Sequence, residues 1–451
     1  MNVLLINPPS LSIYSTFGLG LPPMGLLYVA AALENQGHRV VIRDINTPGG
    51  MLSDSDILRA ELVGISSDTT RIPQAMKIAR RVSRLGRPVI MGGPHPQFMA
   101  AEILSSADVN CIVKGEGELV MTALAAAYES GSDLTAVKGL IFQKNGLLTD
   151  TGDAEPPDVE RLPLPARHLV DMRQYSGTIA GRPVAGLISS RGCPGACHFC
   201  SSSSFFGRRW RPRSPQSILE EIDLLHKQYG YKAIAFLDDN YTLLPERVNE
   251  ISDGLIARDY DLKLWNFSRV DTIVRNPEMV ARMARAGTCM VYLGIESDNE
   301  ETLNSLGKRS SPREAAQAVE LLRTNGIESY GSYIIGTLND TPASIKRTVG
   351  MAIRLNTNIA QFSILTPYPG TQLFSQLKDR IFTRKWKFFD GLHLVFRHPV
   401  FNRYRLQFLL LKAFFRYYRR SREAIDGFKQ AGTRSKLTCR KLATCFWELF
   451  I

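Results

Sequence analysis

The second half of the chain repeats one unit: a short apolar run, a polar loop, and then a helix that begins with proline. The apolar runs lie at 184–188, 233–237, 262–268, 290–295, 330–335 and 361–365. The predicted helices lie near 215–228, 245–258, 277–286, 312–325 and 342–355, each with proline in its first turn, where a missing N–H costs no hydrogen bond. This alternation predicts parallel strands in a partial (β/α)6 barrel, whose chemistry lies at the carboxyl ends of the strands.

The first part of the chain predicts a separate parallel sheet. Apolar runs at 3–6, 39–42, 62–66 and 88–91 alternate with helices, which is typical of a doubly wound sheet with helices on both faces. The predicted fold class is therefore α/β: a Rossmann-like amino-terminal sheet, a partial barrel and a basic helical tail. We expect domains at 1–135 and 175–375, a hairpin and linker at 136–174, and a basic, aromatic region at 376–451.

The composition is that of a packed protein. Hydrophobic residues make up 44% and charged residues 22% of the 451, and no apolar run approaches the ~18 residues that a membrane-spanning helix needs. The amino terminus carries no basic segment with a cleavage site after it. The seven cysteines are an odd, clustered set, so we expect reduced thiols and a cytoplasmic location.

The net charge of +12 comes from the tail. Residues 371–451 hold 18 Lys and Arg against 5 Asp and Glu, so the rest of the chain is close to neutral and nucleic-acid binding is not favoured. A helix over 406–420 would present an apolar face bordered by cations. It could pack on the barrel, lie on a membrane surface, close over the active site or bind nucleic acid, and we favour the first, followed by peripheral membrane contact.

The strongest chemical signal is a run of three cysteines, Cys193, Cys197 and Cys200, which follows a predicted strand. Three soft thiolates within eight residues can hold one iron–sulfur cluster, and three ligands leave one of four irons open to a small molecule. A structural zinc site usually has four ligands in two pairs, and a disulfide would leave an odd thiol in a reducing compartment. Both alternatives are therefore disfavoured.

This segment resembles the core of radical S-adenosylmethionine (SAM) enzymes, whose cysteine loop carries an aromatic residue at the position of Phe199. The resemblance implies that the three cysteines bind a [4Fe-4S] cluster and that SAM chelates the open iron. An electron donor such as flavodoxin or ferredoxin would then start SAM cleavage to a 5′-deoxyadenosyl radical. The resemblance also implies ribose contact by Glu296 and adenine packing by Gly336.

Four more residues at strand ends are candidates for contact with the substrate: Asp238, Asp239, Tyr333 and Tyr368. The acids have a simpler interpretation as surface residues and the tyrosines as core residues. A helix-capping role is the corresponding alternative for Glu296.

Glycine-rich loops follow the strands of the first sheet, and glycine lets the backbone approach a bulky ligand. The residues expected at a cofactor there are Asn7, Ser66, Gly92, Gly93, Gly115 and Glu116. Turn formation in any doubly wound sheet is the alternative explanation. Over residues 1–127 the loops resemble the cobalamin-binding domain in front of many radical enzymes. The nearest match to a D-x-H-x-x-G motif, residues 44–49, has asparagine in place of histidine. No protein imidazole is therefore expected on cobalt, and His95 is expected to shape the backbone.

Residues 1–375 together resemble cobalamin-dependent radical SAM enzymes. In that family a deoxyadenosyl radical abstracts hydrogen from substrate carbon, and methylcobalamin supplies the methyl group. The leading hypothesis is methyl transfer to an unactivated carbon of a lipid-like or natural-product substrate. The principal alternative is an anaerobic oxidative ring cyclase or rearrangement enzyme of the tetrapyrrole-cyclase type. A third hypothesis is a non-catalytic corrinoid or redox sensor, which the intact cysteine loop disfavours.

Overall fold

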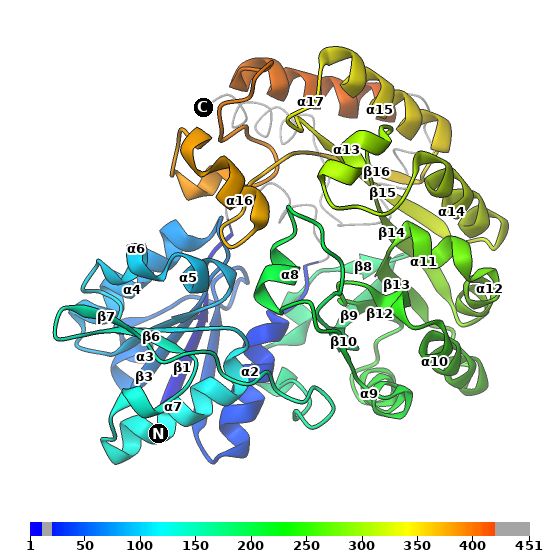
Figure 1. Ribbon diagram of the computed structural model, residues 1–451. Coiled ribbons are helices and arrows are strands. Elements are labelled where there is room, and N and C mark those ends of the chain that lie inside the picture. The colour runs from blue at the N-terminus through cyan, green and yellow to red at the C-terminus, as the bar shows by residue number, and fades with distance from the viewer. Residues whose placement is uncertain (11–19, 420–451) are drawn as a thin grey trace.

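The computed structural model describes residues 1–10 and 20–419 and folds them into two α/β halves (Figure 1). The amino-terminal half lies beside the barrel half, and helix α8 (Ser201–Phe205) lies where the two meet. The predicted α/β class is confirmed: a doubly wound sheet is followed by a curled partial barrel and a carboxy-terminal helix.

The first sheet has seven strands in the order β2-β1-β3-β4-β5-β6-β7. Their bounds are Asn2–Asn7 (β1), Arg39–Asp44 (β2), Leu62–Ser66 (β3), Val89–Gly92 (β4), Cys111–Val113 (β5), Leu140–Lys144 (β6) and Leu147–Asp150 (β7). Strands β1 to β5 pair in parallel, whereas β6 pairs antiparallel with β5 and forms the predicted hairpin with β7. The hairpin that we expected in the linker is thus an edge of this sheet.

Helices cover both faces of the first sheet. They are α2 (Met24–Asn35), α3 (Asp54–Arg59), α4 (Ile72–Arg84), α5 (Pro94–Phe98), α6 (Ala100–Leu104) and α7 (Gly117–Ser130). Because strand side chains alternate between faces, Leu5 packs in the core with α2 and α7, and Leu4 packs in the core with α3 and α4. Both leucines are 1% exposed, as the continuous apolar run of β1 predicts for a sheet covered on both faces.

The second sheet has the order β16-β15-β14-β13-β12-β9-β8. Its strands are Thr178–Ile179 (β8), Arg182–Leu187 (β9), Ala233–Phe236 (β12), Lys263–Ser268 (β13), Thr288–Glu296 (β14), Glu328–Ile335 (β15) and Ile359–Ile364 (β16). Strands β9 and β12 to β16 pair in parallel and are the six predicted barrel strands, while β8 adds an antiparallel edge. A two-stranded ribbon of β10 (Ser190–Arg191) and β11 (Arg211–Pro212) flanks the cysteine loop.

The predicted barrel helices form with their prolines in the first turn. The helices of this half, besides α8, are α9 (Pro215–Lys227), α10 (Pro245–Arg258), α11 (Val270–Arg275), α12 (Pro277–Arg285), α13 (Glu300–Ser305), α14 (Pro312–Thr324) and α15 (Pro342–Leu355). Ser311 and Thr341 close capping boxes before α14 and α15, so side-chain oxygens satisfy N–H groups that the helix leaves free.

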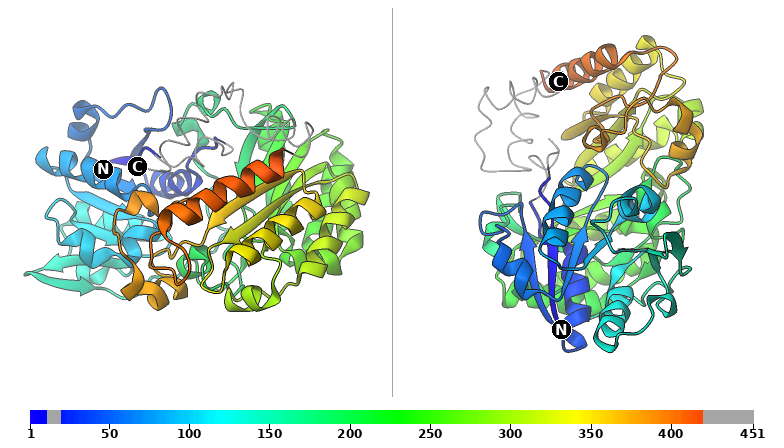
Figure 2. Two further views of the ribbon diagram at one scale, coloured as in Figure 1. Left: turned by 90° about the horizontal axis from the view of Figure 1, so that it is seen from above. Right: turned by 90° about the vertical axis from the view of Figure 1, so that its left-hand side faces the viewer.

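The carboxy-terminal region binds the two halves together. After α16 (Gln372–Leu377), the Trp386 indole N–H donates to Glu102 of the first half at 2.8 Å. Helix α17 (Arg403–Tyr418) lies along α15 and β16 (Figure 2), with Leu406, Leu410 and Tyr417 fully buried. The helix expected at 406–420 therefore packs on the barrel.

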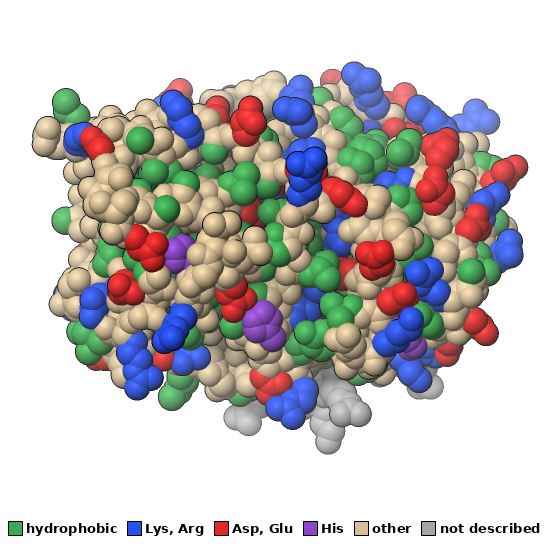
Figure 3. All heavy atoms as spheres, turned by 90° about the horizontal axis from the view of Figure 1, so that it is seen from below, with side chains coloured by type: hydrophobic (Ala, Val, Ile, Leu, Met, Phe, Trp, Pro, Cys, Tyr) green, Lys and Arg blue, Asp and Glu red, His purple; other side chains and the backbone are tan. Residues whose placement is uncertain are grey.

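Residues 420–451 of the basic tail lie outside the described residues. Within 1–10 and 20–419, no helix has the length and apolar character needed to cross a bilayer. Seen from below, acidic and basic side chains are interspersed over the surface, in keeping with the near-neutral charge of the chain before the tail (Figure 3).

Candidate active site and cofactor cavities

The three cysteines line one cavity at the carboxyl ends of the barrel strands. Cys193, Cys197 and Cys200 lie on the loop between β10 and α8, and each is half-buried. The cavity encloses about 1280 Å³, part of which is open to solvent. Phe199, the expected aromatic residue of the loop, also lines it. Burial raises the pKa of the Cys193 and Cys197 thiols, while the nearby Arg269 opposes that shift.

Gly195 allows the sulfur atoms to converge. A Cβ placed on this glycine would lie 3.3 Å from Cys193 Sγ, 4.0 Å from Cys197 Sγ and 3.1 Å from an Arg269 nitrogen. Any side chain there would therefore fill the space between the thiols. Among the described residues, no three His, Cys, Asp or Glu side chains are grouped as ligands of a single metal ion.

Glu296 ends β14 at the wall of the same cavity, as the sequence predicted. Its carboxylate pairs with Lys308, with 2.9 Å between Oε1 and Nζ, and both side chains are nearly buried. Burial opposes the charge on Lys308, but Glu296 and Cys197 outweigh it, so the pKa of Lys308 is raised. A Cβ on Gly294 would lie 2.5 Å from Lys308 Nζ, so glycine is needed there for this pair. Glu296 itself has φ of 66°, a strained conformation typical of functional sites.

The neighbouring acids Asp238 and Asp239 have different environments. Asp238 is fully buried and accepts hydrogen bonds from the Ser189 N–H at 2.7 Å and the Ser190 hydroxyl at 2.6 Å. It therefore fixes the strand before the cysteine loop and does not line the cavity. Asp239 does line the cavity, and burial raises the pKa of both carboxyls.

Two further candidates lie away from the cavity. The Tyr333 ring is fully buried and stacks on Phe362, with 5.2 Å between ring centroids. A Cβ on Gly336 would meet Leu406 of α17 at 2.5 Å, so the face expected to meet adenine is covered by the carboxy-terminal helix. Tyr368 does line the cavity.

The structure adds wall residues that the sequence had not singled out. Lys308, Gln361 and Asp390 all line the cavity. Asp390 also accepts a hydrogen bond from His393 Nδ1 at 2.9 Å, and both residues are buried. Asp390 lies beyond the expected barrel boundary, and Lys308 lies in a loop after a short helix. The repeat of apolar strands and proline-initiated helices therefore marks neither residue as a site candidate. Gln361 is in a predicted strand, where pleat direction decides which side it faces.

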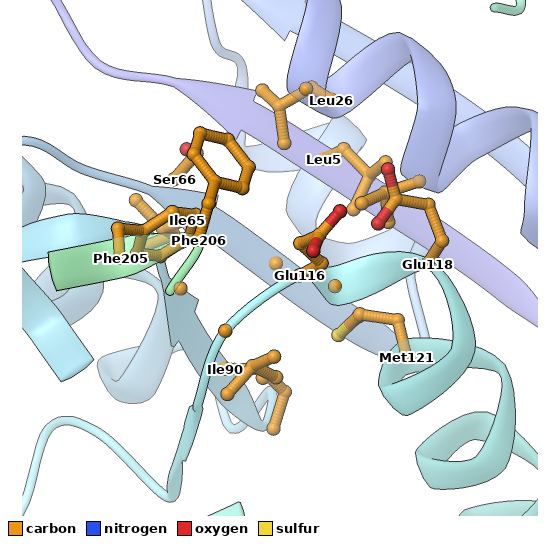
Figure 4. Close-up of a pocket in the computed structure, with 18 of the residues that line it drawn as sticks. Leu5, Leu26, Ile65, Ser66, Ile90, Glu116, Glu118, Met121, Phe205 and Phe206 are labelled. Atoms are coloured by element: carbon orange, nitrogen blue, oxygen red, sulfur yellow. The ribbon is translucent and has the colours of Figure 1, made fainter. Parts of the chain in front are cut away.

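A second cavity lies at the strand ends of the first sheet (Figure 4). Its volume is about 850 Å³, including some open solvent. Six glycines line it: Gly25, Gly64, Gly92, Gly93, Gly115 and Gly117. The predicted Ser66 and Glu116 lie there too. Asn7 does not, because its side chain donates to Asp44 at 2.9 Å and accepts from Arg71 at 2.8 Å.

The barrel half completes the wall of this second cavity. Ile188, Arg191, Phe205 and Phe206 reach it from the segments on either side of the cysteine loop. Figure 4 shows the two phenylalanines beside Ile65 and Ser66, with Glu116 and Glu118 farther along the cavity.

His95 lies in α5, directly after β4, and lines neither cavity. Its Nδ1 is 3.2 Å from the Thr69 hydroxyl, and its ring meets Trp386 edge to face at 4.7 Å. Burial lowers the pKa of His95 to about 3, so the ring is neutral. His95 thus contacts Thr69 of the first half and Trp386 of the carboxy-terminal region, and its role in shaping the backbone stays a prediction.

The residues present fit the cofactors that the sequence implies. Three thiols around a glycine suit an iron–sulfur cluster, and Glu296 lies near them with a carboxylate that can accept from hydroxyl groups. The second cavity is apolar, and glycines bring backbone to its wall, which suits a wide, flat ring system.

Comparisons with known proteins give a consistent assignment. The Radical SAM superfamily matches residues 187–352, and the B12 binding domain matches residues 12–125. An uncharacterized methyltransferase of Pyrococcus horikoshii is 33% identical over 470 aligned residues, covering 99% of each chain. The anaerobic magnesium-protoporphyrin IX monomethyl ester cyclase of Rubrivivax gelatinosus is 29% identical, covering 84% of this chain and 71% of the cyclase.

A solved structure shares the fold. The radical SAM methyltransferase of Kitasatospora setae, with cobalamin and a [4Fe-4S] cluster bound, superposes with a TM-score of 0.70 at 21% identity. The match covers 84% of this chain and 74% of that one.

Proposed function

Because this chain belongs to the family of radical SAM enzymes that carry a cobalamin-binding domain, we propose that it transfers a methyl group to an unactivated carbon of a lipid-like or natural-product molecule. The cofactors of the family are a [4Fe-4S] cluster, SAM and cobalamin. When bound, they supply a carbon-centred radical and a methyl group. The observation that carries the proposal is the short link between the cavities: Cys200 lines one, and Phe205, at the end of the next helix, lines the other.

In this proposal the protein contributes binding and orientation. Cys193, Cys197 and Cys200 would hold the cluster, and Glu296, oriented by Lys308, would accept hydrogen bonds from the ribose hydroxyls of SAM. Asp239 and Tyr368 would face the substrate from the same cavity. The glycine-lined cavity would hold cobalamin against the wall formed by Phe205 and Phe206.

The residues that line the cavity of the three cysteines favour an amphipathic substrate. Strand pairing places Phe267 beside Tyr292, and both residues line the cavity. Tyr330 lies behind them and extends the aromatic layer beyond Tyr292. The next layer toward the strand ends pairs Ser332 with Gln361. An apolar body resting on aromatic side chains, with a polar group near the amide, matches this surface.

A second candidate function is anaerobic oxidative cyclisation. The relative from Rubrivivax gelatinosus carries that name and matches most of the chain, and its named substrate is a small molecule. In this case SAM would be consumed without a methylated product.

The two functions are separated by anaerobic reconstitution with iron, sulfide and cobalamin, followed by reduction with methyl-labelled SAM. Methyl transfer predicts both deoxyadenosine and label on cobalamin. Cyclisation predicts deoxyadenosine with no label on cobalamin. No deoxyadenosine from a cluster-containing protein, even with extracts of small molecules as substrate, would contradict both and favour the sensor hypothesis.

Peripheral contact with an anionic membrane is a further part of this proposal. The outward face of α17 carries Tyr404, Phe408 and Phe415, which are 62%, 59% and 64% exposed. Lys412 and Arg419 lie on the same face, and α17 contains no acidic residue. Aromatic side chains interleaved with cations suit a surface of anionic headgroups.

Sedimentation with vesicles tests this contact. The protein is expected to bind phosphatidylglycerol vesicles and not phosphatidylcholine vesicles, and the double variant Phe408→Ser/Phe415→Ser to lose binding. Leu147→Ser is the control, because Leu147 is 72% exposed on the hairpin of the first sheet. Equal binding to both kinds of vesicle would contradict the proposal. The electron donor, a flavodoxin or ferredoxin, also stays a prediction, as does the cytoplasmic location.

A further inference from the structure

The strand before the cysteine loop is anchored in the barrel half. The Ser189 hydroxyl donates to Asp238 at 2.5 Å, and the Ser190 hydroxyl does so at 2.6 Å. Arg247 in turn donates to the Ser189 carbonyl at 2.5 Å. Arg191 follows these serines and precedes Gly192 and Cys193, so its backbone joins the anchored segment to the loop that carries the first ligand of the predicted cluster.

The Arg191 side chain reaches into the other half. One guanidinium nitrogen donates to Glu116 at 2.6 Å and the other to Glu118 at 2.7 Å. The guanidinium also lies 4.8 Å from the centre of the Tyr28 ring. Arg211 makes a second ion pair with Glu116, so two cations face two carboxylates.

These groups are withdrawn from water. The side chains of Arg191, Glu116 and Glu118 are 6%, 5% and 3% exposed. Burial disfavours the charged guanidinium, but the two carboxylates outweigh it and raise the pKa of Arg191. Among the ion pairs of the described residues, Glu118 has Arg191 as its only partner. A buried carboxylate left without its cation would be strongly unfavourable, so this contact is strongly constrained.

Both carboxylates belong to the wall of the glycine-lined cavity. Glu116 occupies the N-cap position of α7, between Gly115 and Gly117, and Glu118 lies in the first turn of α7. Figure 4 shows both carboxylates at this cavity. The loop that would cradle cobalamin is therefore held by a side chain whose backbone leads directly into the cysteine loop.

We propose that Arg191 is a positioning residue that couples the two cofactor sites. When the cysteine loop is ordered by its cluster, the guanidinium is held where Glu116 and Glu118 need it, and the cobalamin loop takes its binding conformation. By linkage, cobalamin in its cavity favours the ordered cysteine loop to the same extent. This role goes beyond the proposed reaction, because it concerns the order in which the cofactors assemble.

The test is the affinity of the full chain for hydroxocobalamin, measured anaerobically by absorbance titration with the cluster reconstituted and after its removal. The wild type is expected to bind at least about fivefold more tightly with the cluster, the lower end of usual coupling between sites. Arg191→Lys keeps the positive charge but cannot bridge two carboxylates. The ratio of the affinity with the cluster to the affinity without it is therefore expected to fall to about one in this variant.

Arg167→Lys is the matched control. Arg167 is also buried and pairs with Glu221 at 2.7 Å, but it lines neither cavity. It should lower the melting temperature and keep the wild-type ratio. Glu118→Gln retains the side-chain shape and should reduce the affinity ratio as Arg191→Lys does. It tests the proposal if the Arg191→Lys protein does not fold.

The proposal is overturned if the wild type binds hydroxocobalamin equally with and without the cluster, or if Arg191→Lys keeps the wild-type ratio. Absence of any hydroxocobalamin binding would overturn both the coupling and the cobalamin assignment, whereas normal coupling without methyl transfer would leave the coupling intact.

Discussion

Lys308 Nζ lies 2.9 Å from Glu296 Oε1, and it also donates to the Gly294 carbonyl at 3.1 Å. Lys308 thus connects the loop after α13 to the end of β14, at the wall of the cysteine-lined cavity. This pair gives Glu296 a fixed orientation despite its strained backbone.

Lys308→Met is expected to destabilise the protein by about 3–5 kcal/mol, because it leaves a buried carboxylate without its cation. Chemical denaturation of the cluster-free protein measures this directly. Adding Glu296→Gln to the same chain should restore part of the loss, because the unpaired charge is then removed. A Lys308→Met protein with the wild-type midpoint would show that the pair does not form.

Each of Cys193→Ser, Cys197→Ser and Cys200→Ser is expected to abolish the cluster, since the remaining two thiolates cannot hold it. Iron and sulfide content after reconstitution is the measurement. Cys289→Ser is the control: this half-buried thiol contacts the Leu264 carbonyl at 3.4 Å and lies outside the trio. Wild-type iron content in any of the three variants would remove that cysteine from the ligand set.

Gly93→Ala is expected to cost more stability than Gly86→Ala. Gly93 has φ of 104°, and an added Cβ would lie 2.6 Å from the Ser67 carbonyl oxygen. Gly86 has φ of 72° with open space around it, so alanine there costs only the left-handed backbone penalty of about 1–2 kcal/mol.

Thermal unfolding of the two variants compares these costs, and hydroxocobalamin binding should fall only in Gly93→Ala, because Gly93 lines the cavity. Equal losses of stability would mean that the Ser67 backbone moves away without cost.

Stability should decrease as the pH falls below about 6.5 because of His95. Burial lowers the pKa of His95 to about 3, whereas an unfolded histidine has a pKa of about 6.5. Between these values the unfolded chain binds a proton that the folded chain does not, so stability rises with pH in this window and is flat above it. The effect amounts to about 2 kcal/mol between pH 7 and pH 5.

His95→Gln removes the titrating group, so its stability should fall less over the same pH range. Denaturant midpoints at pH 7 and pH 5 for both proteins provide the comparison. The same pH dependence in both would assign the effect to other groups.

Much of the architecture could be predicted from local pattern. The six parallel barrel strands and the five proline-initiated helices appear where apolar runs and prolines placed them. The hairpin expected within 136–174 also forms, but its membership of the first sheet depends on pairing with Cys111 to Val113, which no local pattern encodes.

The candidate site was predictable only in part, for reasons of side-chain direction. Asp238 and Asp239 are adjacent, yet one anchors Ser189 and the other lines the cavity, because successive residues leaving a strand face opposite sides. Gly336 follows its strand as expected, but Leu406, which lies in a helix far along the chain, covers it.

The elements and the cysteine trio follow from local pattern, because helix period, proline position and ligand spacing act between residues close along the chain. Which groups meet depends on how distant segments pack. Arg191 and Glu118 are 73 positions apart, and neither was among the candidate residues of the sequence analysis. A buried ion pair of this kind forms only when the two halves pack, because only the folded chain removes both charged groups from water.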